Sequence, residues 1–317
     1  AFRDPNGIRP LVLGKLPNDA GWCVASETCA FDILGAEFVR EVEPGEVLRI
    51  NAEGLVSERA VAPRKKALCI FEHVYFARPD SVMDGASVQS MRVKMGEQLA
   101  RESAVEADLV IGVPDSGLPG AEGFSRASGI PCRTGFVKNR YVGRTFIQPT
   151  QEMRELGVRL KLNPLRETIE GKRVVVVDDS IVRGTTSKQI VRMLREAGAT
   201  EVHMRIVSPE VKWPCFYGID TDTQDQLISA RKTPEEVCEW IGADSLAFLS
   251  VEGLLSCVPE GGYCCSCFDG AYPVEIPAVF SQGKFLDGYT PNNLTKASAN
   301  SHRSVSDVAR EIEKEYV

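Results

Sequence analysis

The stretch Lys172-Arg-Val-Val-Val-Val-Asp-Asp-Ser-Ile-Val-Arg-Gly-Thr-Thr-Ser187 decides the fold of this chain. Four consecutive valines, Val174 to Val177, are stiff at χ1 and favour a strand that is buried on both faces. Two acids and a loop rich in hydroxyls follow this strand. The next residues predict a helix with an apolar stripe, which ends at Gly198. This order is typical of an open α/β sheet, which binds ligands at the carboxyl ends of its strands.

The loop before that helix has the residue types that bind a phosphate. It consists of Arg183, Gly184, Thr185, Thr186 and Ser187. Its backbone N–H groups, its hydroxyls and the positive end of the helix dipole all attract an anion. The spacing differs from that of the Walker loop, so ATP hydrolysis is not expected. Asp178 and Asp179 suit sugar hydroxyls or Mg²⁺. The stretch therefore predicts a site for a phosphorylated ribose, and the alternative is a buried strand followed by an acidic turn.

The run Val-Val-Val-Val-Asp-Asp-Ser-Ile-Val-Arg-Gly-Thr-Thr resembles the signature of the type I phosphoribosyltransferases, which use phosphoribosyl pyrophosphate (PRPP). The form Ser-Ile-Val-Arg-Gly-Thr-Thr-Ser is similar to that of one family among them, the glutamine PRPP amidotransferases of purine synthesis. The resemblance implies a parallel sheet with flanking helices. It also implies that Asp178 and Asp179 hold the ribose hydroxyls and Mg²⁺, that residues 184–187 hold the 5-phosphate, and that Arg183 also takes part in PRPP binding.

Composition and charge exclude several classes of protein. The chain has 317 residues, 43% hydrophobic and 26% charged, as in globular proteins of one large or two ordinary domains. A net charge of −7 gives no reason to expect a nucleic-acid partner. No apolar run approaches the ~20 residues of a membrane span, and no secretory signal is recognisable. The ten cysteines are spread along the chain, which favours metal binding or catalysis over disulfides. We expect a cytoplasmic protein.

Residues 1–62 are predicted to be β-rich, with short apolar runs between turns and one helix over Cys29 to Leu34. Asp4 to Gly7 predicts the turn of a hairpin. Residues 3–11 and 25–28 are similar to the later half of the glutaminase domain of the amidotransferases, which is an N-terminal nucleophile hydrolase. The resemblance places the catalytic Cys of that domain upstream of this stretch. We therefore expect a fragment that uses free ammonium but not glutamine.

A polar joint at residues 61–66 predicts a second domain over residues 63–277, and 278–317 are predicted to be a disordered tail with a short helix. The second domain is expected to contain a strand that enters a turn at Cys69, a helix over 88–106, a strand over Leu109 to Val113, a helix over Gly120 to Ser128, a strand over 201–207, and mostly helix over 233–256. His73 and His203 are interpreted as structural, with His203 facing away from Val202, Met204 and Ile206.

The loop Pro114-Asp-Ser-Gly117 ends the expected strand at 109–113. Gly117 allows backbone amides to approach a ligand closely, which suits a second anion site. By itself the sequence indicates only a turn. In the family this loop binds pyrophosphate. The resemblance therefore assigns Asp115, Ser116 and Gly117 to PRPP binding and Ser116 also to magnesium.

Three cations, Lys138, Arg140 and Arg144, lie within seven residues. A solvated charge run is the ordinary interpretation. The position of the run between the two predicted anion loops favours a hinged lid instead, which would neutralise pyrophosphate and exclude water. The family has a flexible loop of similar sequence here, which implies a catalytic role for the three residues.

A Cys-x2-Cys pair, Cys264 and Cys267, is compatible with zinc, iron–sulfur or redox use. Four thiolates would converge if two other cysteines joined it, and the spacing alone does not identify those two. The resemblance to an iron–sulfur subclass of the amidotransferases implies a 4Fe-4S cluster on Cys69, Cys215, Cys264 and Cys267. Cys265 is the rival of Cys264. Cys23 and Cys29 are interpreted as core thiols.

The resemblance to the glutamine PRPP amidotransferases therefore implies an amidophosphoribosyltransferase, in which ammonia displaces pyrophosphate from C1 of PRPP. The resemblance also implies glutamine as the source of ammonia in the intact enzyme, purine nucleotides as feedback inhibitors, and a homotetramer. Two alternatives remain open, a salvage phosphoribosyltransferase that joins a base to PRPP and a non-catalytic PRPP or nucleotide sensor.

Overall fold

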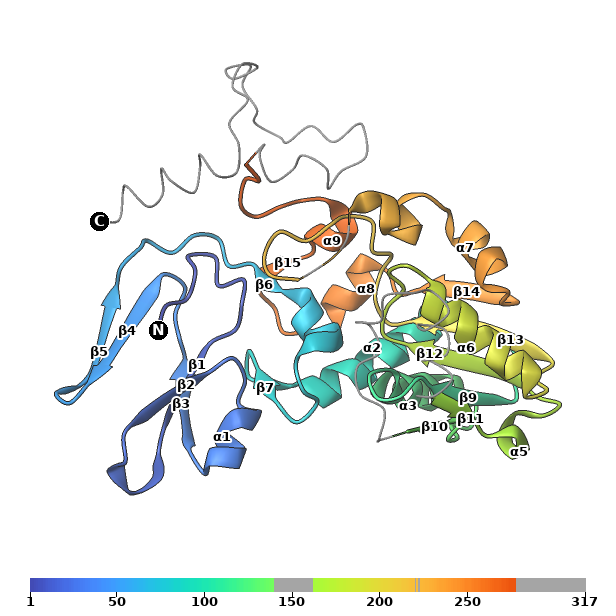
Figure 1. Ribbon diagram of the computed structural model, residues 1–317, viewed down its shortest axis with the longest axis horizontal. Coiled ribbons are helices and arrows are strands. Elements are labelled where there is room, and N and C mark those ends of the chain that lie inside the picture. The colour runs from blue at the N-terminus through green and yellow to red at the C-terminus, as the bar shows by residue number, and fades with distance from the viewer. Residues whose placement is uncertain (140–161, 220, 222, 278–317) are drawn as a thin grey trace, which may run out of the picture.

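The computed structural model describes residues 1–139, 162–219, 221 and 223–277. A β-rich unit formed by the first sixty residues lies beside a larger α/β unit (Figure 1). Among the described residues, no helix is both long and apolar enough to cross a membrane. The predicted tail at 278–317 lies outside the described residues.

The larger unit is built on a four-stranded sheet in the order β14-β13-β12-β9. Its strands are β9 (Leu109–Gly112), β12 (Arg173–Asp178), β13 (Glu201–Ile206) and β14 (Ser245–Phe248). All three pairings are parallel, so the carboxyl ends of these strands lie at one edge. The parallel sheet predicted from the valine run is confirmed.

Helices cover both faces of this sheet, as Figure 1 shows. Their bounds are α2 (Val88–Glu102), α3 (Gly117–Ser128), α5 (Arg166–Ile169), α6 (Thr185–Glu196), α7 (Pro234–Ile241) and α8 (Val251–Ser256). Val175 and Val177 of β12 pack in the core that includes α2 and α3. Val174 and Val176 pack in the second core, with α6 and α7. Alternate valines thus enter opposite cores, which explains why the strand has no polar face.

Helices α2 and α3 pack with their backbones in close contact. A Cβ atom on Gly123 would lie 1.9 Å from the carbonyl oxygen of Val93, and one on Gly96 would lie 2.0 Å from that of Gly120. Glycine is therefore needed at both crossing points. The start of α3 at Gly117 also lies close to the end of β12, at the candidate functional site.

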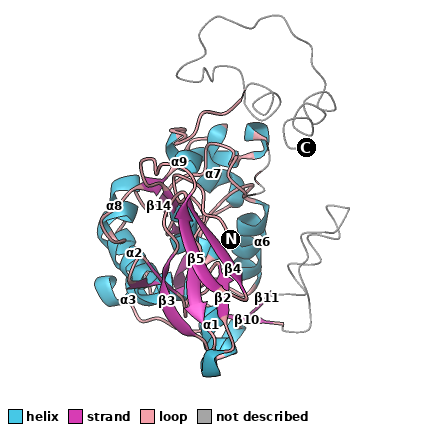
Figure 2. Cartoon of the chain, turned by 90° about the vertical axis from the view of Figure 1, so that its left-hand side faces the viewer, coloured by secondary structure: helices cyan, strands magenta, loops and turns pink. Residues whose placement is uncertain are grey.

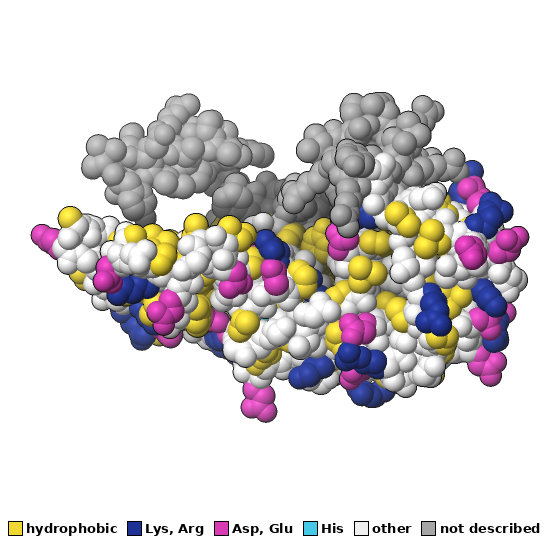
Figure 3. All heavy atoms as spheres, turned by 90° about the horizontal axis from the view of Figure 1, so that it is seen from below, with side chains coloured by type: hydrophobic (Ala, Val, Ile, Leu, Met, Phe, Trp, Pro, Cys, Tyr) yellow, Lys and Arg dark blue, Asp and Glu magenta, His cyan; other side chains and the backbone are white. Residues whose placement is uncertain are grey.

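The β-rich unit has its own small core of Leu13, Val42 and Leu48. It contains the antiparallel sheet β2-β1-β3 and the hairpin β4–β5, whose strands are prominent in Figure 2. Its elements are β1 (Val12–Lys15), the 3₁₀ turn η1 (Pro17–Asp19), β2 (Trp22–Ala25), α1 (Cys29–Leu34), β3 (Glu37–Glu41), β4 (Glu46–Asn51) and β5 (Gly54–Arg59). The predicted helix at Cys29 to Leu34 is confirmed. On the face seen in Figure 3, acidic and basic side chains are interspersed.

The remaining elements are short. They are β6 (Leu68–Cys69), the π-helical turn η2 (Glu72–Phe76), β7 (Val82–Met83), β8 (Ala86–Ser87), β10 (Phe136–Lys138), β11 (Leu162–Pro164), the 3₁₀ turns η4 (Gln224–Gln226) and η5 (Ile228–Ala230), β15 (Tyr263–Cys264) and α9 (Ser266–Asp269).

Several predicted elements differ in the structure. The prediction of a hairpin around Asp4 to Gly7 is wrong. The turn is present, with the N–H of Gly7 donating to Asp4 O over 2.9 Å. Phe2, however, pairs with Val47 and not with the residues after the turn. The helix predicted over 88–106 ends at Glu102, where Ser103 caps it through its hydroxyl. The helix predicted from Gly120 begins at Gly117.

Two further segments differ from the prediction. The strand at Cys69 is only two residues long, and the chain then forms η2. The buried Arg92 donates hydrogen bonds to the carbonyl of His73 in η2 and to that of Ala77, which follows η2. The segment 233–256 is largely helical, as predicted, but β14 between α7 and α8 was not predicted. The four residues of β14 pair with β13 and complete the edge of the parallel sheet.

Candidate functional site

Asp178 is the last residue of β12 and Asp179 follows it, at the carboxyl edge of the sheet. Both side chains are buried, with 7% and 9% of their residue surface exposed. Asp179 accepts hydrogen bonds from the hydroxyl of Ser116, at 2.5 Å, and from that of Ser180. Asp178 accepts one from the backbone N–H of Asp179 at 2.9 Å. The two carboxylates therefore point in defined directions at the ligand-binding edge.

Burial raises the pKa of both acids. Loss of solvent is the main cause for Asp178, and the adjacent Asp179 carboxylate raises its pKa further. For Asp179 the effect of burial is opposed by the hydrogen bonds from Ser116 and Ser180 and by the charge of Arg92. Two acids crowded in this way favour a cation between them, since a bound Mg²⁺ would relieve their repulsion.

The loop Pro114–Gly117 lies directly against the end of β12. A Cβ atom on Gly117 would lie 2.4 Å from the carbonyl oxygen of Val177, so only glycine allows this approach. Gly117 also begins α3, and its N–H donates to Val113 O over 2.9 Å. The peptide between Pro114 and Asp115 is cis. The hydrogen bond from Ser116 to Asp179 then joins this loop to the acid pair.

The hydroxyl-rich loop continues from the acids to the start of α6. Gly184 is the N-cap residue and has a left-handed backbone with φ +75°. Because glycine has no side chain to cap the helix, the N–H groups of the first turn have no partner from that residue. Thr185 is exposed, Thr186 is half-buried and Ser187 is buried. Amides and hydroxyls therefore meet at one helix start, the arrangement that binds phosphate.

The predicted lid is only partly described. Lys138 ends β10, and its ammonium forms an ion pair with the Asp115 carboxylate. This contact brings the base of the predicted lid to the loop at 114–117. Arg140 and Arg144 lie outside the described residues.

The structure thus brings two loops from neighbouring strands around one acid pair. One end of this arrangement offers helix N–H groups and hydroxyls, and the other offers the loop at 114–117 with Lys138 beside it. The acids lie between them. A ligand with a phosphate at one end, hydroxyls in the middle and a second anionic group at the other end would match all three parts.

The cysteines predicted to bind a cluster come from three segments that meet in the structure. Cys69 and Cys264 are register partners in the parallel pair β6–β15. Cys267 lies in α9, and its carbonyl accepts hydrogen bonds from the N–H groups of Lys212 and Trp213, at 2.9 and 3.0 Å, which brings the segment before Cys215 alongside. All four thiols are buried or half-buried, and none of the ten cysteines forms a disulfide.

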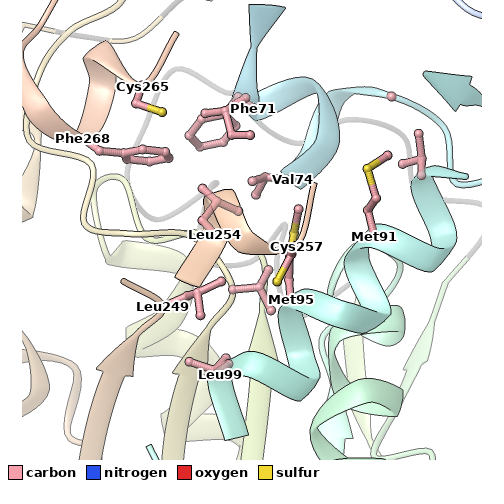
Figure 4. Packing of buried hydrophobic residues seen from close by; sticks show 14 of the residues in the cluster. Phe71, Val74, Met91, Met95, Leu99, Leu249, Leu254, Cys257, Cys265 and Phe268 are labelled. Carbon is pink, nitrogen blue, oxygen red and sulfur yellow. The ribbon is translucent and has the colours of Figure 1, made fainter. Parts of the chain in front are cut away.

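These thiols influence one another's protonation. Burial is the main cause of the raised pKa of Cys267, and the nearby Cys69, Cys264, Cys215 and Cys265 raise it further. Burial also raises the pKa values of Cys69 and Cys265, each to about 12. In the described part of the chain, no three Cys, His, Asp or Glu side chains are arranged to hold one metal ion. Figure 4 shows Cys265 beside the facing rings of Phe71 and Phe268, in the apolar core that surrounds this group.

Three residues around the site were not predicted from the sequence. Ser180 donates to Asp179, Arg92 adds a buried positive charge that acts on it, and Trp240 packs against Gly184. Ser180 lies inside the quoted stretch and could have been included. Arg92 and Trp240 carry no local signal, because their roles depend on how α2 and α7 pack. His203 lies on the opposite face of β13 from Met204, as predicted, and bonds to Ser245 and Glu201 at 2.9 and 3.0 Å.

Comparison with known proteins agrees with this geometry. Residues 94–208 match the family model described as the phosphoribosyl transferase domain, so the chain contains such a domain. This range includes both predicted anion loops and the acid pair. The chain is 59% identical over 287 residues to an amidophosphoribosyltransferase of Synechocystis, with 90% of this chain and 58% of the relative covered. It is 58% identical over 279 residues to that of Bacillus subtilis, with 86% and 58% covered.

Two solved structures are similar to most of this chain. One, described as the allosteric regulatory enzyme of purine biosynthesis, has a TM-score of 0.79 and 57% identity, covering 86% of this chain and 60% of its own. The other is a glutamine PRPP amidotransferase from B. subtilis complexed with ADP and GMP, with a TM-score of 0.78, 57% identity and coverage of 85% and 60%. The chain thus spans about three-fifths of the length of the relatives it matches.

Proposed function

We propose that this chain, which contains a phosphoribosyl transferase domain, transfers ammonia to C1 of PRPP and releases pyrophosphate. The observation that carries the proposal is the junction of the two loops by Ser116 and Asp179, within a chain 59% identical to an amidophosphoribosyltransferase. The C–O bond to pyrophosphate breaks with its electron pair on the leaving group. The lone pair of ammonia forms the C–N bond, and a proton passes to solvent, giving 5-phosphoribosylamine.

Each part of the site has a role in this reaction. Gly184 to Ser187 bind the 5-phosphate, and Arg183 beside them is also assigned to PRPP. Asp178 and Asp179 orient the ribose hydroxyls. Asp115, Ser116 and Gly117 hold the pyrophosphate end, and Lys138 neutralises it together with Arg140 and Arg144. Magnesium bound by Ser116, Asp178 and Asp179 would neutralise charge on the leaving group. The chain itself contributes mainly positioning and charge neutralisation.

The proposal extends to the β-rich unit. We propose that residues 1–62 are part of a glutaminase domain, 63–277 the transferase domain and 278–317 a tail. The separate core of Leu13, Val42 and Leu48 supports the first boundary. Glutamine then supplies ammonia only where the catalytic residues of a complete glutaminase domain are present, and this chain alone is expected to use ammonium.

We propose that Cys69, Cys215, Cys264 and Cys267 bind a 4Fe-4S cluster with a structural role. Support comes from four soft donors on three segments that gather around Cys267. The four thiolates would supply the soft ligands that such a cluster needs. The raised pKa values of Cys69, Cys264 and Cys267 mean that cluster binding must displace protons from these thiols. A cluster would fasten three otherwise short elements, β6, β15 and α9.

The proposal also includes regulation and assembly. The B. subtilis structure contains ADP and GMP, which supports purine nucleotides as regulators of this chain. A homotetramer is proposed from the family resemblance. A cytoplasmic location is proposed because ten cysteines remain unpaired, as in a reducing compartment.

The test is release of pyrophosphate from PRPP and Mg²⁺ with different acceptors. We expect turnover with ammonium at alkaline pH, where ammonia is abundant, and none with glutamine. A matched control, Asp178→Asn/Asp179→Asn, should be inactive with the fold intact. Turnover with a purine or pyrimidine base instead of ammonium would indicate a salvage enzyme. Tight PRPP binding without any turnover would indicate a sensor.

A further inference from the structure

Residues outside the matched domain range of 94–208 pack against the predicted phosphate-binding loop at residues 183–187, hereafter the phosphate loop. A Cβ atom on Gly184 would lie 2.8 Å from Cζ3 of Trp240 and 3.0 Å from Cδ1 of Ile228. Trp240 belongs to α7, and Ile228 begins η5. The left-handed N-cap of α6 is therefore pressed against an indole ring and an aliphatic side chain.

Two further contacts fix Trp240 and Ile228 relative to the loop and α6. The N–H of Ile228 donates to the carbonyl oxygen of Val182 over 2.9 Å, so η5 is tied to the residue that immediately precedes the loop. The ammonium of Lys188 lies 4.6 Å from the centroid of the Trp240 ring. Lys188 follows Gly184 by one helical turn, and its N–H donates to Gly184 O over 2.9 Å. The indole thus contacts both ends of the first turn of α6.

We propose that Trp240 is a positioning residue that holds the phosphate loop in its binding conformation through Gly184 and Lys188. This inference rests on the proposed function. Gly184 can adopt many backbone conformations, including ones that would turn the N–H groups of the first turn away from a phosphate. The ring of Trp240 excludes these by occupying the space behind the loop. Ordering the loop in advance removes part of the entropy cost of ligand binding.

The role of Trp240 concerns binding more than chemistry. The 5-phosphate does not react, so a loop that holds it contributes equally to the ground state and the transition state. Loss of the ring should raise KM for PRPP and leave kcat nearly unchanged. If the loop spends only about one tenth of its time in the binding conformation, the apparent Kd rises about tenfold.

The experiment compares Trp240→Leu and Trp240→Phe with a matched control, Trp213→Leu. The control is apt because Trp213 packs in the same way against Gly270, another left-handed glycine at a helix end, at 2.8 Å from its Cβ position. We measure Kd for ribose 5-phosphate by calorimetry, together with KM and kcat for PRPP. Trp240→Leu should raise Kd and KM about tenfold, and Trp240→Phe should restore most of the affinity. Trp213→Leu should lower the melting temperature without this effect.

A second measurement does not depend on the folding of the leucine variant. The chain has three tryptophans, so Trp22→Phe/Trp213→Phe leaves Trp240 as the one source of indole fluorescence. Its emission should change on titration with ribose 5-phosphate, with a midpoint equal to the calorimetric Kd. An unchanged emission on saturation, or equal Kd values for wild type and Trp240→Leu, would overturn the positioning role. If the wild type binds neither ribose 5-phosphate nor PRPP, the proposed function itself fails.

Discussion

The hydroxyl of Ser116 donates a 2.5 Å hydrogen bond to Oδ2 of Asp179 and so joins two loops that are 63 residues apart in sequence. This contact exists because β9 and β12 are adjacent and parallel, which brings both loops to the same edge. It also depends on Gly117, which lets the first loop lie against the end of β12. The bond orients Oδ2 of Asp179, while the hydroxyl of Ser180 donates to Oδ1 of the same carboxylate.

Replacement of Ser116 tests the value of this junction. Ser116→Ala removes a hydrogen bond to a buried carboxylate, which is worth about 1.5–3 kcal/mol. We expect kcat/KM for PRPP with ammonium to fall at least about tenfold and the required Mg²⁺ concentration to rise. Ser116→Thr keeps the hydroxyl and should retain most activity. A Ser116→Ala enzyme with unchanged magnesium dependence would show that the hydroxyl has no part in metal or ligand binding.

The acid pair is predicted to reduce the stability of the unliganded chain. Burial raises the pKa of both Asp178 and Asp179. A carboxyl group whose pKa is raised in the folded chain stabilises the fold at pH values below its ordinary pKa near 4. This stabilisation is lost as the pH rises through the raised pKa. At pH 7.5 without Mg²⁺, Asp178→Asn should therefore increase the free energy of unfolding by about 1–2 kcal/mol. Activity should fall about a hundredfold or more.

Thermal unfolding with and without Mg²⁺ checks this prediction. The wild type should gain stability when Mg²⁺ and PRPP are added, and Asp178→Asn should gain little. Glu46→Gln is the matched control. Its carboxyl is also buried, but hydrogen bonds from Arg40 and Ser57 hold its pKa at about 2, so its loss should be destabilising. A lower melting temperature for Asp178→Asn at pH 7.5 would contradict the expected sign.

The local sequence was sufficient to predict the central strand β12 and the helix α6 that follows it. It was insufficient to predict the edge strand β14 and the turn η2. The valine run and the hydroxyl loop predicted β12, α6 and the acid pair because burial on both faces and helix capping are local signals. Strand β14 was missed because its four residues lie between two helices and are defined by pairing with β13. The π-helical turn η2 was missed because Arg92, sixteen residues after its end at Phe76, binds carbonyls in and just after it.

The same distinction applies to the site. Gly184 was assigned to phosphate binding from the sequence of its loop. Its contact with Trp240 depends instead on how α7 packs. The four cysteines were assigned only through resemblance. Their approach follows from the β6–β15 pairing and the contact of Lys212 with Cys267, neither of which is visible in the sequence. Spacing favoured Cys264 over Cys265, because only one residue lies between Cys265 and Cys267. In the structure both thiols are buried near Cys267.

Serine variants test that assignment directly. Cys267→Ser should lose bound iron, acid-labile sulfide and visible absorption after anaerobic purification, and should lower the melting temperature, because a structural cluster contributes to folding. Cys265→Ser should keep all three signals. Cys257→Ser is the matched control, since Cys257 is equally buried but donates to Gly253 O at 3.2 Å, away from the group. Iron loss in Cys265→Ser with retention in Cys264→Ser would exchange the roles of these two residues.

Acidification should weaken the fold through His73. This side chain is fully buried, and neither ring nitrogen has a hydrogen-bond partner among the described residues. Burial lowers its pKa to about 4. As the pH falls below the ordinary histidine pKa of 6.5, the unfolded chain takes up the proton on His73 before the folded chain does. The fold therefore loses no stability through His73 above pH 6.5 and loses stability as the pH falls towards 4. The loss amounts to about 3 kcal/mol at full extent.

The variant His73→Phe keeps a ring against Tyr263, which lies 5.6 Å away in an edge-on contact, and removes the titrating group. Its free energy of unfolding at pH 7.5 should equal or exceed that of the wild type, since no hydrogen bond is lost. Between pH 7 and 4 it should lose about 3 kcal/mol less than the wild type in chemical denaturation. His203→Phe provides the contrast: it loses bonds to Ser245 and Glu201 and should be less stable already at pH 7.5. Parallel pH profiles for wild type and His73→Phe would mean that His73 takes up its proton without unfolding.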